Sequence, residues 1–280
     1  MKPKKVLFIT QEITPYVPES ELSILGRRVP QIVQERGREI RTFMPKWGTI
    51  NERRSQLHEV IRLSGMNLII DETDHLLIIK VASIPSARMQ VYFIDNDDYF
   101  MKRLEVCDEN GEECPDNGER AIFYARGVLE TVKKLRWVPD IIHCQGWMST
   151  IAPLYIKTSY REEPSFRDSK IVFTPSGNDL KLSTTQQFRE SILFKGMLGN
   201  ELDEFPERLS NKDLYRLAIK YSDGLMFSQS YQDPDLKTYA EELGLPVLQP
   251  QDITDSDGAQ NVVSFFETIW GDDTEEDSGY

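Results

Sequence analysis

Short apolar runs alternate along the chain with longer segments in which apolar residues recur every three or four positions. The short runs predict buried strands, and the three-to-four spacing predicts amphipathic helices. Strands are expected at residues 5–10, 39–44, 139–143, 170–174, 224–228 and 246–248, and helices at residues 21–36, 117–135, 147–157, 212–221, 234–243 and 259–270. Strands that alternate with helices are typical of a parallel sheet with helices on both faces. The pattern therefore predicts an α/β protein.

The alternation breaks between residues 55 and 95. Four β-type runs follow one another there, at residues 58–63, 67–71, 76–84 and 89–94, with turn residues between them. Consecutive strands without intervening helices favour antiparallel pairing. We therefore predict an antiparallel β insertion over about residues 55–95, and we expect His58 and His75, which have charged neighbours, to lie on its surface. Residues 177–208 are polar and mixed, which predicts short helical pieces and loops.

Length and charge narrow the class of protein. The 280 residues suit one domain, predicted over residues 1–270, followed by an acidic disordered tail, GDDTEEDSGY, at residues 271–280. No apolar run is long enough for a membrane span, and no signal peptide is recognised, so a cytoplasmic protein is expected. The net charge of −13 argues against nucleic acid or an anionic membrane as a partner.

Cysteine usage points to neither a metal nor a disulfide framework. The three cysteines, Cys107, Cys114 and Cys144, lack the spacing of a metal site. Cys107 and Cys114 flank an acidic turn and could pair under oxidation, but reduced thiols are expected in the cytoplasm. The sequence therefore predicts no metal and no cofactor.

The turn after the first strand has an unusual composition. In a doubly wound fold this turn holds phosphate groups, because backbone N–H groups and the positive end of a helix dipole meet there. Such turns usually carry glycine, but this one reads Pro18, Glu19, Ser20 and Glu21. Proline donates no N–H, and the carboxylates repel phosphate. We therefore predict that no nucleotide diphosphate binds at this turn. A metal site at Glu12, Glu19 and Glu21 is less favoured than acids that begin a helix.

Six segments in order resemble the N-terminal domain of bacterial glycogen synthases and plant starch synthases, glycosyltransferases of family 5 with the GT-B fold. These segments are residues 11–25, 37–45 (GREIRTFMP), 95–100 (DNDDYF), 116–120 (DNGER), 142–147 (IHCQGW) and 221–231 (YSDGLMFSQSY). The resemblance extends to about residue 248. It implies the Rossmann-like parallel sheet of a GT-B N-terminal domain. It also implies descent from enzymes that transfer glucose from ADP-glucose to a growing α-1,4-glucan.

The departures from the family pattern predict a catalytic defect. Where the family's K-T-G-G-L-G loop has its lysine, this chain has Pro18, and the loop glycines fall on Ser20, Glu21 and Ser23. The second histidine of the family's H-x-H-D-W is Gln145. No motif of the family's nucleotide-holding C-terminal domain is recognised after residue 250. Positive charge stabilises the departing diphosphate in such transfers, so its loss removes a main source of rate. We therefore assign no catalytic residue.

The resemblance leaves four candidate substrate-binding residues in a degenerate cleft: His143, Gln145, Trp147 and Asn178. His143 either contacts a sugar or is a polar residue at a strand end, and the two interpretations are equally favoured. Gln145 can hydrogen-bond a hydroxyl but cannot act as an acid or base near neutral pH. Trp147 is expected to pack under the following helix rather than to stack on a sugar, and Asn178 lies in a predicted turn.

Three hypotheses for function remain open. The first is a glucan- or partner-binding module of glycogen metabolism, with an α-glucan or a protein as partner. The second is one half of a split ADP-glucose-dependent α-1,4-glucosyltransferase, which would need an exposed apolar face on the last helix, formed by Phe265, Phe266, Ile269 and Trp270. The third is a structural, self-associating protein. The sequence does not predict an oligomeric state.

Overall fold

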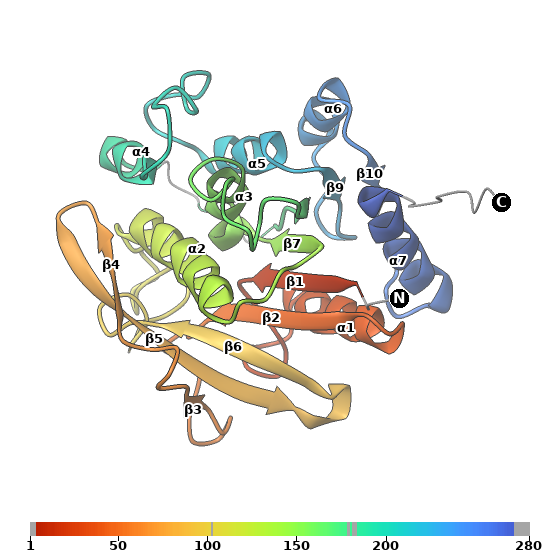
Figure 1. The fold of residues 1–280 in the computed structure, drawn as a ribbon, viewed down its shortest axis with the longest axis horizontal. Helices are drawn as coiled ribbons and strands as arrows, with labels where there is room; N and C mark the ends of the chain where they lie inside the picture. Colours follow the sequence, from red (N-terminus) through yellow and green to blue (C-terminus); the bar gives the residue numbers. More distant parts are fainter. Residues whose placement is uncertain (1–3, 102, 178–179, 181–183, 272–280) are drawn as a thin grey trace, which may run out of the picture.

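The computed structural model describes residues 4–101, 103–177, 180 and 184–271, and it has a mixed α/β architecture (Figure 1). The strands are β1 Lys5–Thr10, β2 Glu39–Pro45, β3 His58–Glu59, β4 Met66–Ile70, β5 Thr73–Ile84, β6 Met89–Asp95, β7 Ile141–Gln145, β8 Lys170–Thr174, β9 Gly224–Met226 and β10 Val247–Leu248. The helices are α1 Glu21–Glu35, α2 Asn117–Lys134, α3 Ile151–Lys157, α4 Gln186–Ile192, α5 Asn211–Lys220, α6 Pro234–Glu242 and α7 Ser256–Trp270, with 3₁₀ turns η1 Pro85–Ala87 and η2 Trp147–Ser149. The predicted α/β fold is therefore confirmed. The predicted tail, residues 271–280, lies outside the described residues except for Gly271.

The strands form a sheet in the order β10-β9-β8-β7-β1-β2-β6-β5-β3, and β4 pairs with β5 off this path. Neighbouring strands from β10 to β6 are parallel. The chain leaves β1 toward β2 and β6, and then crosses to β7 on the other side of β1. In doubly wound sheets, ligands bind outside the carboxyl ends of the strands where the order reverses in this way. The crevice between β1 and β7 is therefore the first place to look for a site.

The predicted antiparallel pairing is confirmed for β3 to β6, but β6 also belongs to the parallel part of the sheet. β5 runs antiparallel to β3, β4 and β6. β6, however, pairs parallel with β2, so it extends the central sheet. The strand expected at residues 58–63 shrinks to two residues, because the chain turns where the Leu63 N–H donates to the Val60 carbonyl, at 2.8 Å.

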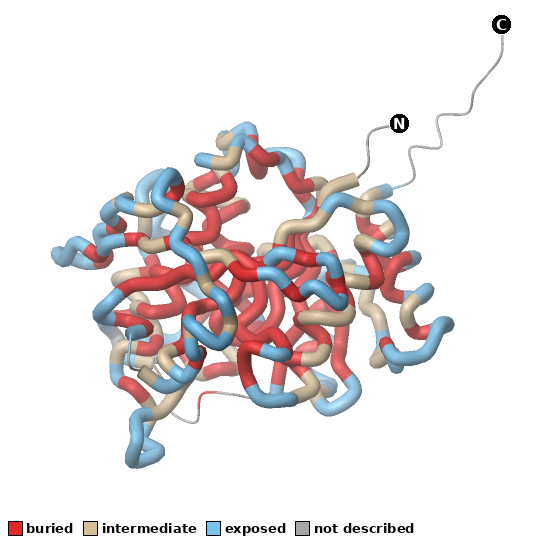
Figure 2. The backbone as a smooth tube through the Cα atoms, turned by 90° about the horizontal axis from the view of Figure 1, so that it is seen from below, coloured by how far each residue is buried: buried red, intermediate tan, exposed pale blue. Residues whose placement is uncertain are grey.

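Two hydrophobic layers sandwich the sheet, because alternate strand residues point to opposite faces. On β1, Val6 and Phe8 pack with α1 and α7, whereas Leu7 and Ile9 pack with α2, α3 and α5. The buried segments in Figure 2 lie in the middle of the molecule, and the exposed segments lie mainly in outer loops. None of the helices in the described part of the chain is long and apolar enough to cross a membrane.

The prediction for the two histidines of the insertion is half right. His58 is exposed, as expected, but His75 is buried. On β5, His75 alternates inward with Leu77 and Ile79, and its Nε2 lies 2.9 Å from the Tyr99 hydroxyl. Strand alternation therefore outweighed the charged neighbours on which the surface prediction rested.

The hairpin at residues 107–113 separates the two cysteines that flank the acidic turn. Cys107 pairs with Glu113 in an antiparallel bridge, so Cys114 is one position out of register with Cys107. Side chains at successive strand positions point to opposite faces, which directs the two thiols apart. The three cysteines form no disulfide.

Candidate functional site

The crevice between the carboxyl ends of β1 and β7 is filled by the chain's own side chains. The Gln11 side chain is buried, and its Oε1 accepts the Met148 backbone N–H at 3.2 Å. At Gly146, which has a φ of 78°, a Cβ would lie 2.4 Å from Gln11 Oε1 and 3.0 Å from Leu22 Cδ2. Gln11 and Leu22 thus occupy the space through which a ligand would approach the backbone at this point.

The first turn of α1 is capped from within the chain. Ser20 is the N-cap, and its hydroxyl accepts the Ser23 N–H at 3.0 Å, while the Ser23 hydroxyl accepts the Ser20 N–H at 2.9 Å. The Ser20 hydroxyl also donates to the buried Glu12 carboxylate. This capping box satisfies the N–H groups of Ser20 and Ser23, which a phosphate-binding turn would leave for its ligand.

The Glu21 carboxylate joins α1 to the loop between β9 and α6. Its oxygens accept the backbone N–H groups of Gln229 and Ser230, the latter at 2.7 Å. A small cavity of about 60 Å³ adjoins this contact, lined by Ser20, Glu21, Leu22, Leu25, Ser176, Gly177, Ser228 and Ser230. A negative charge therefore sits at the edge of the sheet where an anionic ligand would be expected.

The structure places His143 and Gln145 together, but inside the molecule. β7 extends to Gln145, so His143 lies in mid-strand rather than at a strand end, paired with Phe8 and Val172. Its ring packs between those of Phe8 and Phe266, with centroids 5.7 and 5.4 Å away. Nε2 lies 2.8 Å from Thr174 Oγ1, and Nδ1 lies 3.3 Å from Gln145 Nε2. Complete burial lowers the pKa of His143 to about 3, so the ring is neutral at pH 7.

The other two predicted site residues lie elsewhere. Trp147 is buried in the layer formed with α2 and α3, on the opposite face of the sheet from His143. It packs in the core, as expected, and its Nε1 has no hydrogen-bond partner among the described residues. Asn178 lies outside the described residues. Three of the four candidates therefore have almost no exposed surface.

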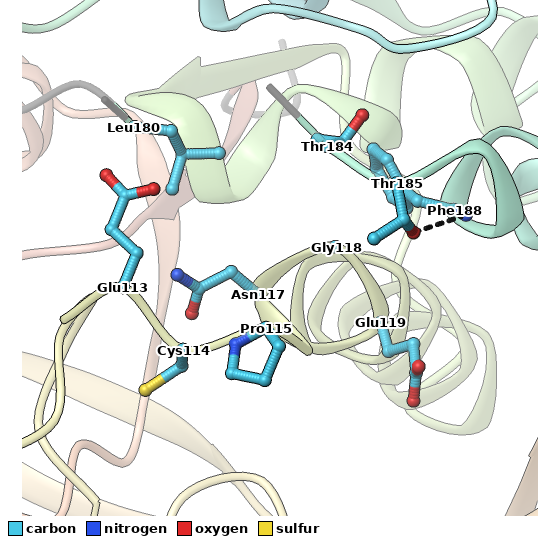
Figure 3. Close-up of a pocket in the computed structure, with 10 residues that line it drawn as sticks. All are labelled: Glu113, Cys114, Pro115, Asn117, Gly118, Glu119, Leu180, Thr184, Thr185 and Phe188. Carbon is cyan, nitrogen blue, oxygen red and sulfur yellow. Dashed lines mark hydrogen bonds between the residues drawn. The ribbon is translucent and has the colours of Figure 1, made fainter. Parts of the chain in front are cut away.

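A larger cavity, of about 240 Å³, opens at the start of α2 (Figure 3). Its lining comes from the loop before α2, the first turn of α2 and the segment that leads into α4: Glu113, Cys114, Pro115, Asn117, Gly118, Glu119, Leu180, Thr184, Thr185 and Phe188. Glu119 is held by the Tyr99 hydroxyl, which donates to its carboxylate at 3.1 Å. Gly118 is required for the approach of α4, because a Cβ there would lie 2.4 Å from the Phe188 ring. The cavity thus combines hydrogen-bonding and apolar groups.

A buried cation lies near the carboxyl end of β1. Arg120 is fully buried, donates to the carbonyls of Leu104 and Glu105 at 3.0 and 2.7 Å, and stacks over Trp47. Burial and the charge of Glu12 raise the pKa of Glu105 to about 7, against the opposing effect of Arg120. In the described part of the chain, no group of three or more His, Cys, Asp or Glu side chains is arranged to hold a metal ion.

Comparison with known proteins agrees with this fold. The starch synthase catalytic domain family matches residues 5–233. The chain belongs to this family. Among its family relatives, a glycogen synthase of Pelodictyon phaeoclathratiforme is 42% identical over 171 residues, which cover 61% of this chain and 35% of that protein. A glycogen synthase of Chlorobaculum parvum is 34% identical over 225 residues, which cover 78% of this chain and 44% of that protein. The chain thus spans less than half of the length of these two relatives.

A solved member of the starch synthase group has the same fold. The catalytic domain of starch synthase IV from Arabidopsis thaliana, bound to ADP and acarbose, superposes with a TM-score of 0.71 at 16% identity. The match covers 91% of this chain and 53% of that one. At this identity the likeness shows the fold alone. It establishes the GT-B type of the sheet that the sequence predicted.

Sequence reasoning missed the residues that fill the first turn. The composition of residues 18–21 indicated that a phosphate would not bind, but it did not show that Gln11 would occupy the crevice. The partners of Glu21 lie 208 and 209 residues away, beyond the reach of any local pattern. The unusual absence of glycine at the turn was the available signal that side chains would take the ligand's place.

Proposed function

We propose that this member of the starch synthase catalytic domain family binds an α-glucan but does not itself transfer glucose from ADP-glucose. The observation that carries the proposal is the filled first turn: Gln11 and Leu22 occupy the crevice, and the Glu21 carboxylate occupies backbone donors beside it. The described residues around this turn leave neither space nor positive charge for a diphosphate.

The replacement of the family's lysine- and glycine-containing turn affects the barrier to glucosyl transfer. Transfer from a nucleotide sugar develops negative charge on the departing diphosphate, and one preorganised hydrogen-bond donor to such charge lowers the barrier by about 3 kcal/mol. Here the position of the family's lysine holds Pro18, and the nearest charged side chains in the turn are the carboxylates of Glu19 and Glu21. Carboxylates would raise the barrier rather than lower it.

Glucan binding is supported by different features. The relatives of this chain are glycogen synthases, and the starch synthase IV structure is described as bound to acarbose. The α2 cavity places the Glu119 carboxylate and the Thr185 hydroxyl beside the apolar Leu180 and Phe188, a mixture that suits a neutral sugar. We assign the glucan to this cavity rather than to His143, Gln145 and Trp147, because those three side chains are buried.

Calorimetric titration with ADP-glucose and, separately, with maltoheptaose tests both parts of the proposal. We expect heat from maltoheptaose and none from ADP-glucose. Glu119→Gln should lower the affinity for maltoheptaose. Glu112→Gln, the same change at an exposed position outside the cavity, should leave this affinity unchanged. Micromolar binding of ADP-glucose would overturn the non-catalytic assignment, and a silent maltoheptaose titration would overturn the glucan assignment.

The split-enzyme alternative gains no support from the last helix. It needed an exposed apolar face on α7, but Phe265, Phe266 and Ile269 are buried in the layer shared with α1 and the sheet. Trp270 is half-buried, and the cations of Lys4 and Arg38 lie over its ring. The apolar side of α7 is therefore already used within this chain.

A further inference from the structure

The contact between Glu21 and the β9–α6 loop has the geometry of a bound anion. Two successive backbone N–H groups, those of Gln229 and Ser230, each donate to a different oxygen of one carboxylate, at 2.5 and 2.7 Å. The 2.7 Å distance from the Ser230 nitrogen is in the range of charge-assisted hydrogen bonds. Converging backbone donors of this kind are also how proteins hold phosphoryl oxygens.

The surroundings of these two donors suit an oxyanion. They follow β9, at the carboxyl edge of the parallel sheet. The adjoining cavity carries the hydroxyl-bearing side chains of Ser176, Ser228 and Ser230, and also Ser20, whose hydroxyl already donates to Glu12. Hydroxyl groups can donate to a phosphoryl oxygen without needing a charge of their own. Among the described residues that line this cavity, Glu21 carries the only carboxylate.

We propose that the N–H groups of Gln229 and Ser230 form a site for a phosphoryl group, which the chain closes with its own Glu21 in an autoinhibitory contact. The inference rests on the proposed function in one respect, the absence of a diphosphate from the first turn. It adds that two backbone donors beside that turn, the N–H groups of Gln229 and Ser230, are available for an anion and are bound by the Glu21 carboxylate.

Position explains why the internal carboxylate prevails over a free anion. Glu21 is the first residue of α1, where the helix dipole favours negative charge, and the capping box at Ser20 fixes its backbone. A tethered group meets its donors at a high effective concentration, which a free ligand must exceed. The exposed Glu19 and the net charge of −13 repel incoming anions as well.

Glu21→Ala tests the inference, with inorganic phosphate as the probe and Glu19→Ala as the matched control. Both changes remove one negative charge from the same turn, but only Glu21 bonds to the loop. We expect Glu21→Ala to bind phosphate about ten- to hundredfold more tightly than the wild type, the range that corresponds to freeing one or two charge-assisted hydrogen bonds. Glu19→Ala should resemble the wild type. Amide NMR should show phosphate-dependent shifts at Gln229 and Ser230.

Three results would overturn the inference: a folded Glu21→Ala that gains no phosphate affinity, an equal gain in Glu19→Ala, or phosphate shifts confined to other amides. If Glu21→Ala does not fold, Glu21→Gln replaces it, since glutamine keeps the side-chain shape but has a single acceptor oxygen. Glu21→Gln should show a smaller gain in phosphate affinity, with shifts at the same two amides. No gain in this variant also overturns the inference. A failure of the proposed function can be told apart from these results. It would appear in the wild type, as binding of ADP-glucose or as no binding of maltoheptaose.

Discussion

His143 is a titratable residue buried where it can be only neutral. Its pKa is lowered to about 3 by burial, against about 6.5 in an unfolded chain. A group whose pKa is depressed on folding contributes stability above the unfolded value, and that stability is lost as the pH falls toward the folded value. Acidification below pH 6.5 therefore favours the unfolded chain, which takes up the proton. Between pH 7 and pH 5 we expect His143 alone to lower the free energy of unfolding by about 2 kcal/mol.

Urea unfolding at pH 5, 6 and 7 measures this contribution. His143→Gln keeps a hydrogen-bonding side chain beside Thr174 but cannot titrate, so its stability should change less with pH over this interval. His58→Gln, at an exposed position, should follow the wild-type curve. An equal pH dependence in wild type and His143→Gln would contradict the burial of a neutral imidazole.

Glu105 produces the opposite dependence. Burial, with the charge of Glu12 adding to it, raises the pKa of Glu105 from 4.5 to about 7. An acid with a raised pKa contributes stability below pH 4.5 that is lost as the pH rises through about 7. Glu105→Gln mimics the protonated form, so it should be more stable than the wild type at pH 8 by about 1–3 kcal/mol and equal to it near pH 4.5. Thermal unfolding at the two pH values decides this, and a variant that is no more stable at pH 8 refutes the assignment.

At the scale of elements, α1 is fixed to the turn before it by a close approach at Gly26. A Cβ at this position would lie 2.2 Å from the Glu12 carbonyl oxygen and 3.2 Å from Thr10 Oγ1. Gly26→Ala should therefore force α1 away from β1 and lower the free energy of unfolding by about 1–3 kcal/mol, although alanine is the better helix former. Glu35→Ala, at the exposed end of the same helix, is the control. Unchanged or increased stability of Gly26→Ala in chemical denaturation would contradict this packing.

The elements themselves were largely predictable, because each has a local cause. The periodicity of Leu22, Leu25, Val29, Ile32 and Val33 placed α1 to within one residue, and the apolar runs located β1 and β8. The pairing partners of the strands were harder to predict from the sequence, because a strand's neighbours in the sheet depend on distant segments. Thus β6 was assigned to the antiparallel insertion, although it also pairs parallel with β2.

The candidate site shows the same limit more sharply. The replaced loop at residues 18–21 could be read from the sequence, because proline and carboxylates have fixed chemical consequences. The depth of His143 could not, since a two-residue difference in the end of β7 moves it from a strand end to the middle of the sheet. The contact between Glu21 and Ser230 required the fold, which alone brings α1 beside the β9–α6 loop.

At the scale of the whole molecule, the net charge of −13 destabilises the folded state, because the excess negative charges repel one another. Many of the ion pairs involve at least one half-exposed side chain, and such pairs contribute little. The pair between Lys80 and the buried Asp95, at 2.7 Å, is shielded from salt by its surroundings. Added salt should therefore weaken repulsion more than attraction.

We accordingly expect the melting temperature to rise with NaCl from about 10 mM to about 0.15 M, an interval over which the Debye length shortens from about 30 to about 8 Å. Each 1 kcal/mol gained corresponds to about 2–4 °C in a protein of this size. Replacing the exposed Glu72 and Glu242 with lysine changes the net charge from −13 to −9, since each replacement removes one negative charge and adds one positive charge. This variant should respond less to salt. A melting temperature that falls with salt would mean that the ion pairs, rather than the net charge, dominate the electrostatics of the fold.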